Sequence, residues 1–233
     1  MLRRSLALGA IAIAFGLFGA APRSHAAMDP KSFIGNLGQE GIQTLGPNVP
    51  PAQRIARFHQ LFQADFDVPN IGRFVIGRYW RAFTPEQQQE FLRLFADYTV
   101  QAYADKLGPY GGSQFRVLGA APAGEEVVVS SEVVRSNGPP VRMDWHVAPS
   151  GGGYKVTDVY VDNVSMRITQ RDEFAKIIQN NGGQPTALLA VLRQQLHEGP
   201  AAASTRGAAA PYGMTPNQPG GMAPAEPRGV PMR

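Results

Sequence analysis

The order of apolar and polar positions divides the chain into a helical part, a part made of strands and a second helical part. Between residues 29 and 107, apolar side chains recur every three or four positions, which is the period of an amphipathic helix. From 114 to 161 apolar and polar side chains alternate, as in a strand, and the helical period returns from 166 to 197. Because helices and strands are segregated, the pattern predicts an α+β fold in which helices pack on one face of a twisted antiparallel sheet.

The first part is expected to form four helices, and two of them have clear start signals. They run from 29 to about 45, from near 52 to 66, within 67–83, and from 85 to about 107. Asp29-Pro30 offers an N-cap followed by proline at the first helical position. Thr84-Pro85-Glu86-Gln87 has a threonine cap, proline at the first position and glutamine at the third, which is a capping box.

The alternating part predicts four strands, at 114–118, 125–135, 141–147 and 154–161. Ser136-Asn137-Gly138 and Gly151-Gly152-Gly153 are turn sequences between consecutive strands. Strands joined by such short turns run antiparallel, so the sheet is expected to be a meander. Two closing helices are predicted near 166–180 and 186–197.

The N-terminus has the layout of a secretory signal peptide, which we assign to residues 1–26. Arg3 and Arg4 precede an uncharged apolar run from Leu6 to Ala21, and Ser24-His25-Ala26 supplies small residues before the expected cleavage site. A membrane anchor is the alternative, but this run is shorter than the ~20 residues that a spanning helix needs. The mature protein is therefore expected to be soluble and to act outside the cytoplasm.

The C-terminus, residues 199–233, is dominated by three residue types. Gly, Ala and Pro make up 21 of its 35 residues, and no apolar period survives. Such a segment buries too little surface to offset the entropy of ordering it, so we expect a disordered tail. A tether to peptidoglycan or a partner is the alternative. The folded α+β domain is thus expected to cover residues 27–198.

The net charge of +4 resides in these two ends. Six of the 22 basic and one of the 18 acidic side chains lie outside 27–198, which leaves the domain with a net charge of −1. A neutral domain lacks the basic footprint of a nucleic-acid binder, so no nucleic-acid partner is expected. The chain has no cysteine, which excludes a disulfide framework, a cysteine-ligated metal and a thiol nucleophile.

No catalytic or metal site stands out in the domain. Its histidines lack the spacing of a zinc site; they are His59, His146 and His197. Asp65-Phe66-Asp67 has the two-carboxylate spacing of some metal-dependent transferases, but Asp67 is more simply the cap of the next helix. Asp158 and Asp162 fall on one face of a strand, as a general acid/base pair would, although a row facing solvent or a partner is the more common arrangement. We therefore expect no enzyme, no metal and no cofactor.

The segment 154–165, which reads YKVTDVYVDNVS, resembles the signature of the MlaC family, the toluene-tolerance periplasmic lipid carriers. Asn163 stands where that signature usually has glycine. Arg171-Asp172-Glu173-Phe174 matches the Arg-x-x-Phe that follows it. Upstream, 66–71, 77–81 and 84–87 resemble family motifs in the same order, so the resemblance covers roughly residues 29–198.

The resemblance implies a cone similar to nuclear-transport-factor-like and cystatin-like domains, in which helices wrap a twisted antiparallel sheet around an apolar cavity. It also implies a monomeric periplasmic carrier of phospholipid, whose partners are an inner-membrane MCE-domain ABC transporter and an outer-membrane lipoprotein complex. Residues 165–174 resemble relatives found beside hopanoid-synthesis genes, so a hopanoid cargo stays open. Two further classes stay open as well: a periplasmic adaptor without a ligand, and an enzyme on the same scaffold.

Within that resemblance, large apolar side chains from helices and strands are the candidates for the lipid pocket. They are Phe74, Trp80, Phe95 and Tyr98 from the helices, and Val129, Val133, Met143, Trp145, Val147 and Val161 from the strands. Ordinary core packing is the competing role for each. Arg78 and Arg81 are candidates for contact with a phosphate headgroup or an acidic partner, and a solvated helix face is their competing role.

Overall fold

The computed structural model describes residues 29–44, 46, 49–107, 112–135 and 138–198 of the chain. The expected signal peptide (1–26), the tail (199–233) and most of the turn at 136–138 lie outside the described residues. The helices are α1 (Pro30–Thr44), α2 (Pro51–Asp65), α3 (Val68–Ile76), the 3₁₀ helix η1 (Gly77–Ala82), α4 (Pro85–Leu107), α5 (Met166–Asn180) and α6 (Pro185–Glu198). The strands are β1 (Gln114–Ala123), β2 (Glu126–Val134), β3 (Val141–Ser150), β4 (Gly153–Val161) and β5 (Val164–Ser165).

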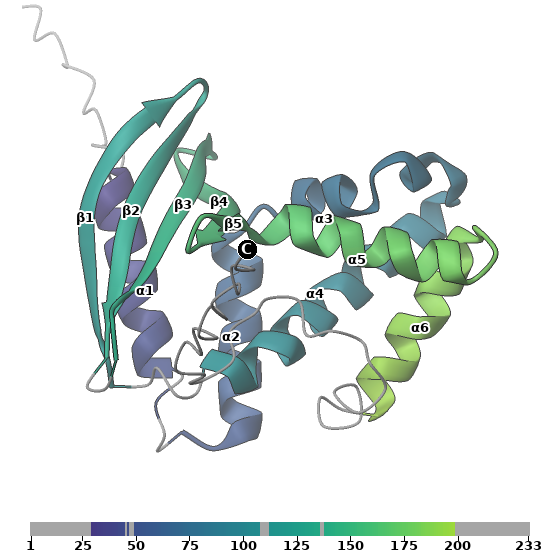
Figure 1. Cartoon of the computed structure of the whole chain (residues 1–233), viewed down its shortest axis with the longest axis horizontal. Helices are drawn as coiled ribbons and strands as arrows, with labels where there is room; N and C mark the ends of the chain where they lie inside the picture. The colour runs from purple at the N-terminus through teal and green to yellow at the C-terminus, as the bar shows by residue number, and fades with distance from the viewer. Residues whose placement is uncertain (1–28, 45, 47–48, 108–111, 136–137, 199–233) are drawn as a thin grey trace, which may run out of the picture.

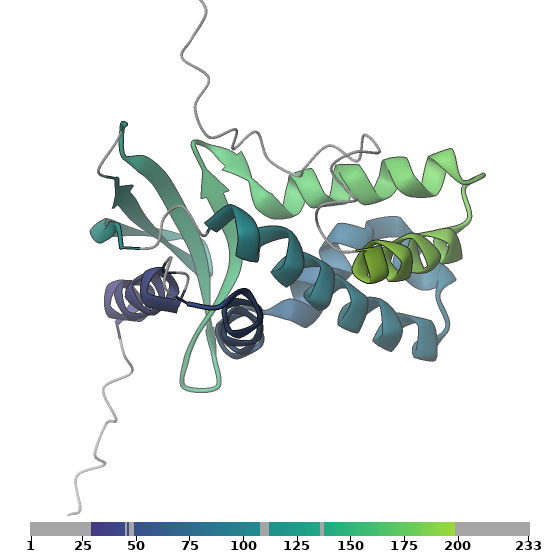
Figure 2. The same cartoon turned by 90° about the horizontal axis from the view of Figure 1, so that it is seen from below.

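The strands form one sheet in the order β1-β2-β3-β4-β5, with every neighbouring pair antiparallel, so the predicted meander is confirmed. Figure 1 shows the curved sheet with α1 behind it, and α3 to α6 gathered beyond the edge formed by β4 and β5. Figure 2 shows the same division from below. The α+β fold predicted from the segregated periods is therefore confirmed.

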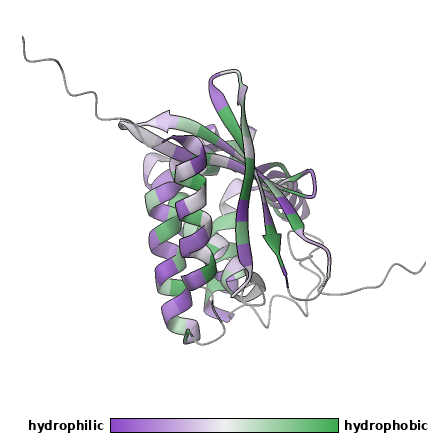
Figure 3. Ribbon diagram, turned by 90° about the vertical axis from the view of Figure 1, so that its left-hand side faces the viewer, coloured by the Kyte–Doolittle hydropathy of each residue, from purple (hydrophilic) through white to green (hydrophobic). Residues whose placement is uncertain are grey.

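Two details of the sheet differ from the prediction. β1 continues five residues past Leu118, because a register shift between Val117 and Gly119 lets it go on pairing where alternation is lost. The two-residue β5 was not predicted, since it is too short to show a period. The alternation of apolar and polar side chains along the longer strands is visible in Figure 3.

The start signals of the helices act as expected. The Asp67 carboxylate accepts from the Asn70 N–H at the start of α3, so this residue is a cap. At α4 the Thr84 N–H donates to Gln87 Oε1 at 3.0 Å and the Gln87 N–H donates to Thr84 Oγ1 at 3.3 Å, which completes the capping box. The helix expected within 67–83 divides at Gly77, whose φ of 55° ends α3 and begins η1.

The buried apolar side chains form two cores instead of one. The helix cluster is built by α3 to α6, with Phe62 and Phe83; its members are Phe62, Val68, Ile71, Val75, Ile76, Phe83, Phe91, Phe95, Ala96, Val100, Phe174, Ile178, Leu188, Leu189 and Leu192. The sheet cluster joins α1 and α2 to the inner face of the sheet; its members are Ile34, Leu37, Leu61, Val129, Trp145, Val147 and Val156. The partly buried Phe66 packs against both clusters.

The sheet cluster depends on the close approach of α1 to β1. Gly38 lies against the Phe115 ring, and a Cβ added at this position would come within 2.3 Å of that ring. The glycine that weakens the helical pattern of α1 is therefore the residue that lets the helix cover the sheet.

Candidate functional site

A cavity of about 160 Å³ lies at the seam between the helix cluster and the sheet cluster. Its helical wall comes from Phe58 and Phe62 of α2, Ile71 and Val75 of α3, and Phe95 of α4. Its sheet wall comes from β3 and β4; the apolar residues there are Met143, Trp145, Val159 and Val161. The first turn of α5 and the adjoining part of β4 add a short polar stretch. The cavity surface is nevertheless almost entirely apolar, because the polar atoms of these residues point away from the open space.

Four of the ten predicted pocket residues line this cavity: Phe95, Met143, Trp145 and Val161. Trp145 is the best fixed of them. Its indole N–H donates to Ser131 Oγ at 2.9 Å, and Phe115 meets its ring edge to face with centroids 6.2 Å apart. The polar atom of the tryptophan is thus satisfied within the sheet, which leaves its apolar ring as part of the wall.

The three predicted valines outside the lining are buried in the sheet. Val129 and Val147 are fully buried in the sheet cluster. Val133 is buried further along β2, where it pairs with Phe115 and Val141. These side chains share the inner face with Trp145, but other apolar groups already cover them.

The three predicted aromatic residues outside the lining pack on the helix cluster. Phe74 lies beneath two guanidinium groups, those of Arg167 at 4.6 Å and Arg171 at 5.2 Å from the ring centroid. The Trp80 ring meets the edge of Phe91 with centroids 6.4 Å apart. Tyr98 packs beside Phe174, and burial, with a smaller contribution from the nearby Glu173 charge, raises its pKa to about 12.

Several lining residues were not predicted, although the apolar period of the sequence places them on the buried faces of helices. That period does not distinguish side chains that line a cavity from side chains packed in the core. Phe58 and Phe62 lie on the apolar stripe of α2, Phe66 follows directly after that helix, and Ile71 and Val75 lie on the apolar side of α3. Period shows which face of an element is buried. It does not show whether that face meets a neighbouring side chain or a gap.

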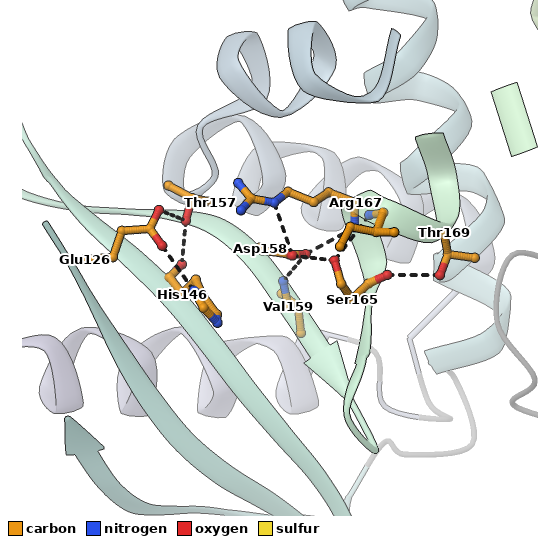
Figure 4. Close-up of polar contacts among 9 residues, drawn as sticks. Glu126, His146, Thr157, Asp158, Val159, Ser165, Arg167 and Thr169 are labelled. Atoms are coloured by element: carbon orange, nitrogen blue, oxygen red, sulfur yellow. Dashed lines mark hydrogen bonds and ion pairs between the residues drawn. The ribbon is translucent and has the colours of Figure 1, made fainter. Parts of the chain in front are cut away.

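Asp158 is the most enclosed polar group of the cavity wall (Figure 4), and its side chain has no exposed surface. Its carboxylate accepts hydrogen bonds from the backbone N–H of Val159 at 2.8 Å, from the Ser165 hydroxyl at 2.5 Å and from the backbone N–H of Arg167 at 3.1 Å. It also forms an ion pair with Arg167 Nε at 3.2 Å. These contacts fasten the start of α5 to β4 and offset the cost of burying the charge.

The expectation of a solvent-facing row of carboxylates on β4 is therefore wrong for Asp158. β5 and the first turn of α5 fold back over this side chain, whereas Asp162 lies past the end of the strand and is exposed. Asp162 and Asn163 form the turn between β4 and β5 with φ of 48° and 67°. Asparagine adopts this left-handed backbone more readily than most residues, which explains how Asn163 replaces a glycine.

A second polar group joins β2, β3 and β4 beside the cavity (Figure 4). The Thr157 hydroxyl donates to Glu126 Oε1 at 2.7 Å, and His146 Nδ1 lies 3.1 Å from Glu126 Oε2. Burial alone would raise the pKa of Glu126, but the Thr157 hydrogen bond, the His146 contact and the charge of Arg167 outweigh it and hold the pKa below its usual value.

This arrangement does not form a nucleophile–base pair. A nucleophilic hydroxyl needs a base that takes its proton, usually a histidine within hydrogen-bond reach. The Thr157 hydroxyl instead donates to a carboxylate, and His146 is not among the residues that line the cavity. The Asp158 carboxylate is occupied by its own donors. The geometry thus favours a binding site over a catalytic one.

The described residues outside the cavity were compared with three other kinds of site: a second hollow, a metal site and a membrane-spanning helix. A hollow of about 630 Å³ between α1 and α2 is lined mainly by polar side chains, among them Gln39, Glu40 and Arg57. Within the described ranges, no group of three or more His, Asp or Glu side chains is placed to hold a metal ion. None of the helices described is both long and apolar enough to cross a bilayer.

Comparison with known proteins finds a family, a curated relative and a solved structure that this chain resembles. The MlaC protein family model matches residues 43–194. The toluene tolerance protein ttg2D of Pseudomonas putida is 32% identical over 106 residues, which are 45% of this chain and 49% of that protein. This chain therefore aligns with about half the length of that relative.

Among solved structures, a phospholipid-binding protein from Ralstonia solanacearum, determined in complex with a phospholipid, has the same fold. Its TM-score is 0.63 at 24% sequence identity, and the match covers 73% of this chain and 98% of that one.

Proposed function

The chain belongs to the MlaC family, and from this premise we propose that it is a periplasmic phospholipid-binding transport protein. In the finer proposal, it carries phospholipid between an outer-membrane lipoprotein complex and an inner-membrane MCE-type ABC transporter, as a monomer and without enzymatic chemistry. The expected signal peptide at residues 1–26 is the route by which it reaches the periplasm. The phospholipid held by the Ralstonia solanacearum neighbour supports the ligand class.

The apolar seam cavity is the observation that carries the proposal. Acyl chains gain about 0.8 kcal/mol for each CH₂ group removed from water, so a carrier must cover them with apolar surface. Aromatic and aliphatic side chains from α2, α3, α4, β3 and β4 provide such a surface here.

The size of the cavity implies that loading widens it. Its volume of about 160 Å³ is close to that of an engineered cavity of ~150 Å³ that binds benzene, so two acyl chains need more room. The seam is the place where this room can be made, because the two walls of the cavity belong to different clusters, with the partly buried Phe66 as a contact that both share. We therefore propose that the clusters move apart as the chains enter.

Native mass spectrometry with a cavity-filling variant tests the proposal. Protein purified from a Gram-negative periplasm, and again after incubation with phospholipid vesicles, should carry a mass increment that fragments as phospholipid. Val159→Trp places a large ring in the cavity wall and should reduce lipid occupancy at least tenfold, because it fills the space that the acyl chains need.

Leu118→Trp is the matched control, since Leu118 is 48% exposed on β1 and outside the cavity lining. Equal occupancy in both variants would contradict a seam site. A protein that takes up no lipid from vesicles would contradict the carrier function and favour a periplasmic adaptor without a ligand. Triterpenoid fragments would replace phospholipid by a hopanoid cargo.

A further inference from the structure

Four exposed arginines, which we call the arginine face, lie in or against the 3₁₀ helix η1: Arg73, Arg78, Arg81 and Arg171. The Arg73 guanidinium lies over the Trp80 ring of η1, 5.9 Å from its centroid. Arg171 of α5 reaches the first residue of η1, where a Cβ added to Gly77 would come within 3.3 Å of its Nε. Because α3 and α5 pack side by side (Figure 1), arginines from distant parts of the sequence meet at this one surface.

Aromatic rings hold three of these guanidinium groups in place. Besides the contact of Arg73 with Trp80, Arg78 lies over the Tyr79 ring at 4.9 Å and donates to its hydroxyl at 2.8 Å. The Arg171 guanidinium lies 5.2 Å from the centroid of the Phe74 ring. A guanidinium that stacks through its flat side keeps N–H groups at its edge for an oxygen acceptor. These side chains are therefore ordered before any partner binds, which lowers the entropy lost on binding.

The arginine face lacks the ion pairs that other arginines of the chain form. Among the described residues, none of its four members has a carboxylate within ion-pair distance. Arg116, Arg167 and Arg193, in contrast, are each paired with a carboxylate. The charges of the arginine face are thus left for a partner outside the fold.

The local charge is positive although the domain as a whole carries −1. From Val68 to Ala82, α3 and η1 contain three arginines and no acidic residue. The exposed carboxylates nearest along the chain are Glu86 and Asp172, and four arginines against these two leave a net charge of +2. Asp67 caps the other end of α3, about 13 Å from η1 at about 1.5 Å per residue. The sign of the face therefore predicts an anionic partner.

The partner is expected to be an extended surface. None of the four arginines lines the seam cavity or the hollow between α1 and α2, so they do not surround a small molecule there. Ile168, which is 47% exposed, lies one turn before Arg171 on α5 and adds an apolar contact at the edge of the face. Basic side chains with an exposed apolar neighbour are typical of proteins that bind the surface of an anionic membrane.

We propose that the arginine face docks the protein on an anionic phospholipid bilayer through the headgroup phosphates. The inference rests on the proposed carrier function and adds the surface by which the carrier meets a membrane. Ile71 and Val75 of α3 line the seam cavity, so docking through α3 and η1 brings one cavity wall to the bilayer. Guanidinium groups cover the aromatic rings, so the contact stays at the level of the headgroups and the rings do not enter the acyl layer.

Sedimentation with vesicles tests this docking surface. The protein is mixed with vesicles of phosphatidylcholine, alone or with an equal part of phosphatidylglycerol, at low salt. The wild type should bind the phosphatidylglycerol vesicles at least tenfold better, and about 0.5 M salt should release it, because the screening length then falls to about 4 Å. The triple variant Arg73→Gln, Arg78→Gln, Arg81→Gln should bind on the order of a hundredfold less, since each basic side chain near an anionic surface contributes roughly fivefold.

A second triple variant, Arg57→Gln, Arg93→Gln, Arg142→Gln, is the matched control. It removes the same charge from exposed arginines on α2, α4 and β3, and it should keep the binding within about threefold. Lysine in place of the three arginines at 73, 78 and 81 keeps the charge and should retain most of the binding. All three variants change only exposed side chains, so their urea unfolding curves should stay close to that of the wild type.

Loading of phospholipid from detergent micelles, followed by native mass spectrometry, separates docking from carrying. Both glutamine variants should load like the wild type, because none of the substituted arginines lines the cavity. Equal vesicle binding by the two glutamine variants would overturn the docking surface, as would a wild type that loads lipid but does not distinguish the two kinds of vesicle. Retention on immobilised polyglutamate without binding to phosphatidylglycerol vesicles would replace the membrane by an acidic protein. A wild type that loads no lipid would instead contradict the carrier function itself.

Discussion

The helix cluster and the sheet cluster are both built of buried apolar side chains, but they are packed in different ways. The helix cluster is held by contacts among aromatic rings, and Phe91 alone meets Trp80, Phe83, Phe95 and Phe174. The sheet cluster is mostly aliphatic, with valines of three strands covered by α1 and α2. The partly buried Phe66 packs against both clusters, and the cavity lies beside it at their seam.

Truncation of a ring inside the helix cluster gives the largest expected effect. Phe91→Ala removes a fully buried side chain and should lower the free energy of unfolding by about 3–5 kcal/mol, because the helices around it cannot collapse into the gap. Val159→Ala, at the seam, should cost about 1 kcal/mol or less, since its side chain already borders open space. Urea unfolding measures the free energy of unfolding of both variants. Similar decreases in the two would contradict the distinction between the packed helix cluster and the seam.

The polar side of the seam gives the next largest effect. Asp158→Ala leaves the Ser165 hydroxyl, the Arg167 N–H and the Arg167 guanidinium without their acceptor, and should cost about 3 kcal/mol. Asp172→Ala, which removes an exposed carboxylate from the same helix, should change the stability by less than about 0.5 kcal/mol. A mild effect of Asp158→Ala would mean that the start of α5 is held by other contacts.

An alkaline titration probes the helix side through Tyr98. Its pKa of about 12 in the fold lies above its value of about 10 in the unfolded chain, so the native state keeps its proton over a wider range. The resulting stability is complete below pH ~10 and is lost as the pH rises toward ~12. Tyr98→Phe should be less sensitive to pH in that window, as followed by unfolding curves. Identical pH profiles would show that Tyr98 is not buried in the native state.

An acid titration probes the sheet side through Glu126 and is expected to give the smallest effect. The pKa of Glu126 is lowered in the fold, so its stabilisation is present above the unfolded value of about 4.3 and is lost as the pH falls through the folded value. Thr157→Val removes a hydrogen bond to the ionised form and should raise this pKa, at a cost of about 1 kcal/mol or less near neutral pH. An NMR titration measures the shift, and an unchanged pKa would contradict the role given to Thr157.

The fold could be predicted from the sequence because its causes are local. Period 3.6 and period 2 show which faces are buried, and side chains such as those of Asp67 and Thr84 mark where helices begin. The division of the third helix at Gly77 and the two-residue β5 were missed. Neither feature is long or regular enough to produce a recognisable spacing of apolar residues in the sequence.

The site could be predicted only in part, because whether a buried side chain lines the cavity depends on which residues lie opposite it in the fold. Val147 and Trp145 are two positions apart on one face of β3, yet Val147 is fully buried and does not line the cavity, whereas Trp145 does. The burial of Asp158 depends on α5 folding back over β4, which the alternation within β4 does not reveal. These features depend on how helices and strands pack together, which the sequence pattern of a single strand or helix does not reveal.

The two tryptophans of the chain offer the most direct test of where acyl chains bind. Trp145 lines the seam cavity, whereas Trp80 packs on the helix cluster outside the lining. Phospholipid with brominated acyl chains quenches tryptophan emission on contact, so Trp80→Phe and Trp145→Phe each leave one reporter. We predict strong quenching in Trp80→Phe, where Trp145 remains, and little in Trp145→Phe. Equal quenching in both variants, or quenching of Trp80 alone, would contradict the claim that the seam between the two clusters is the lipid site.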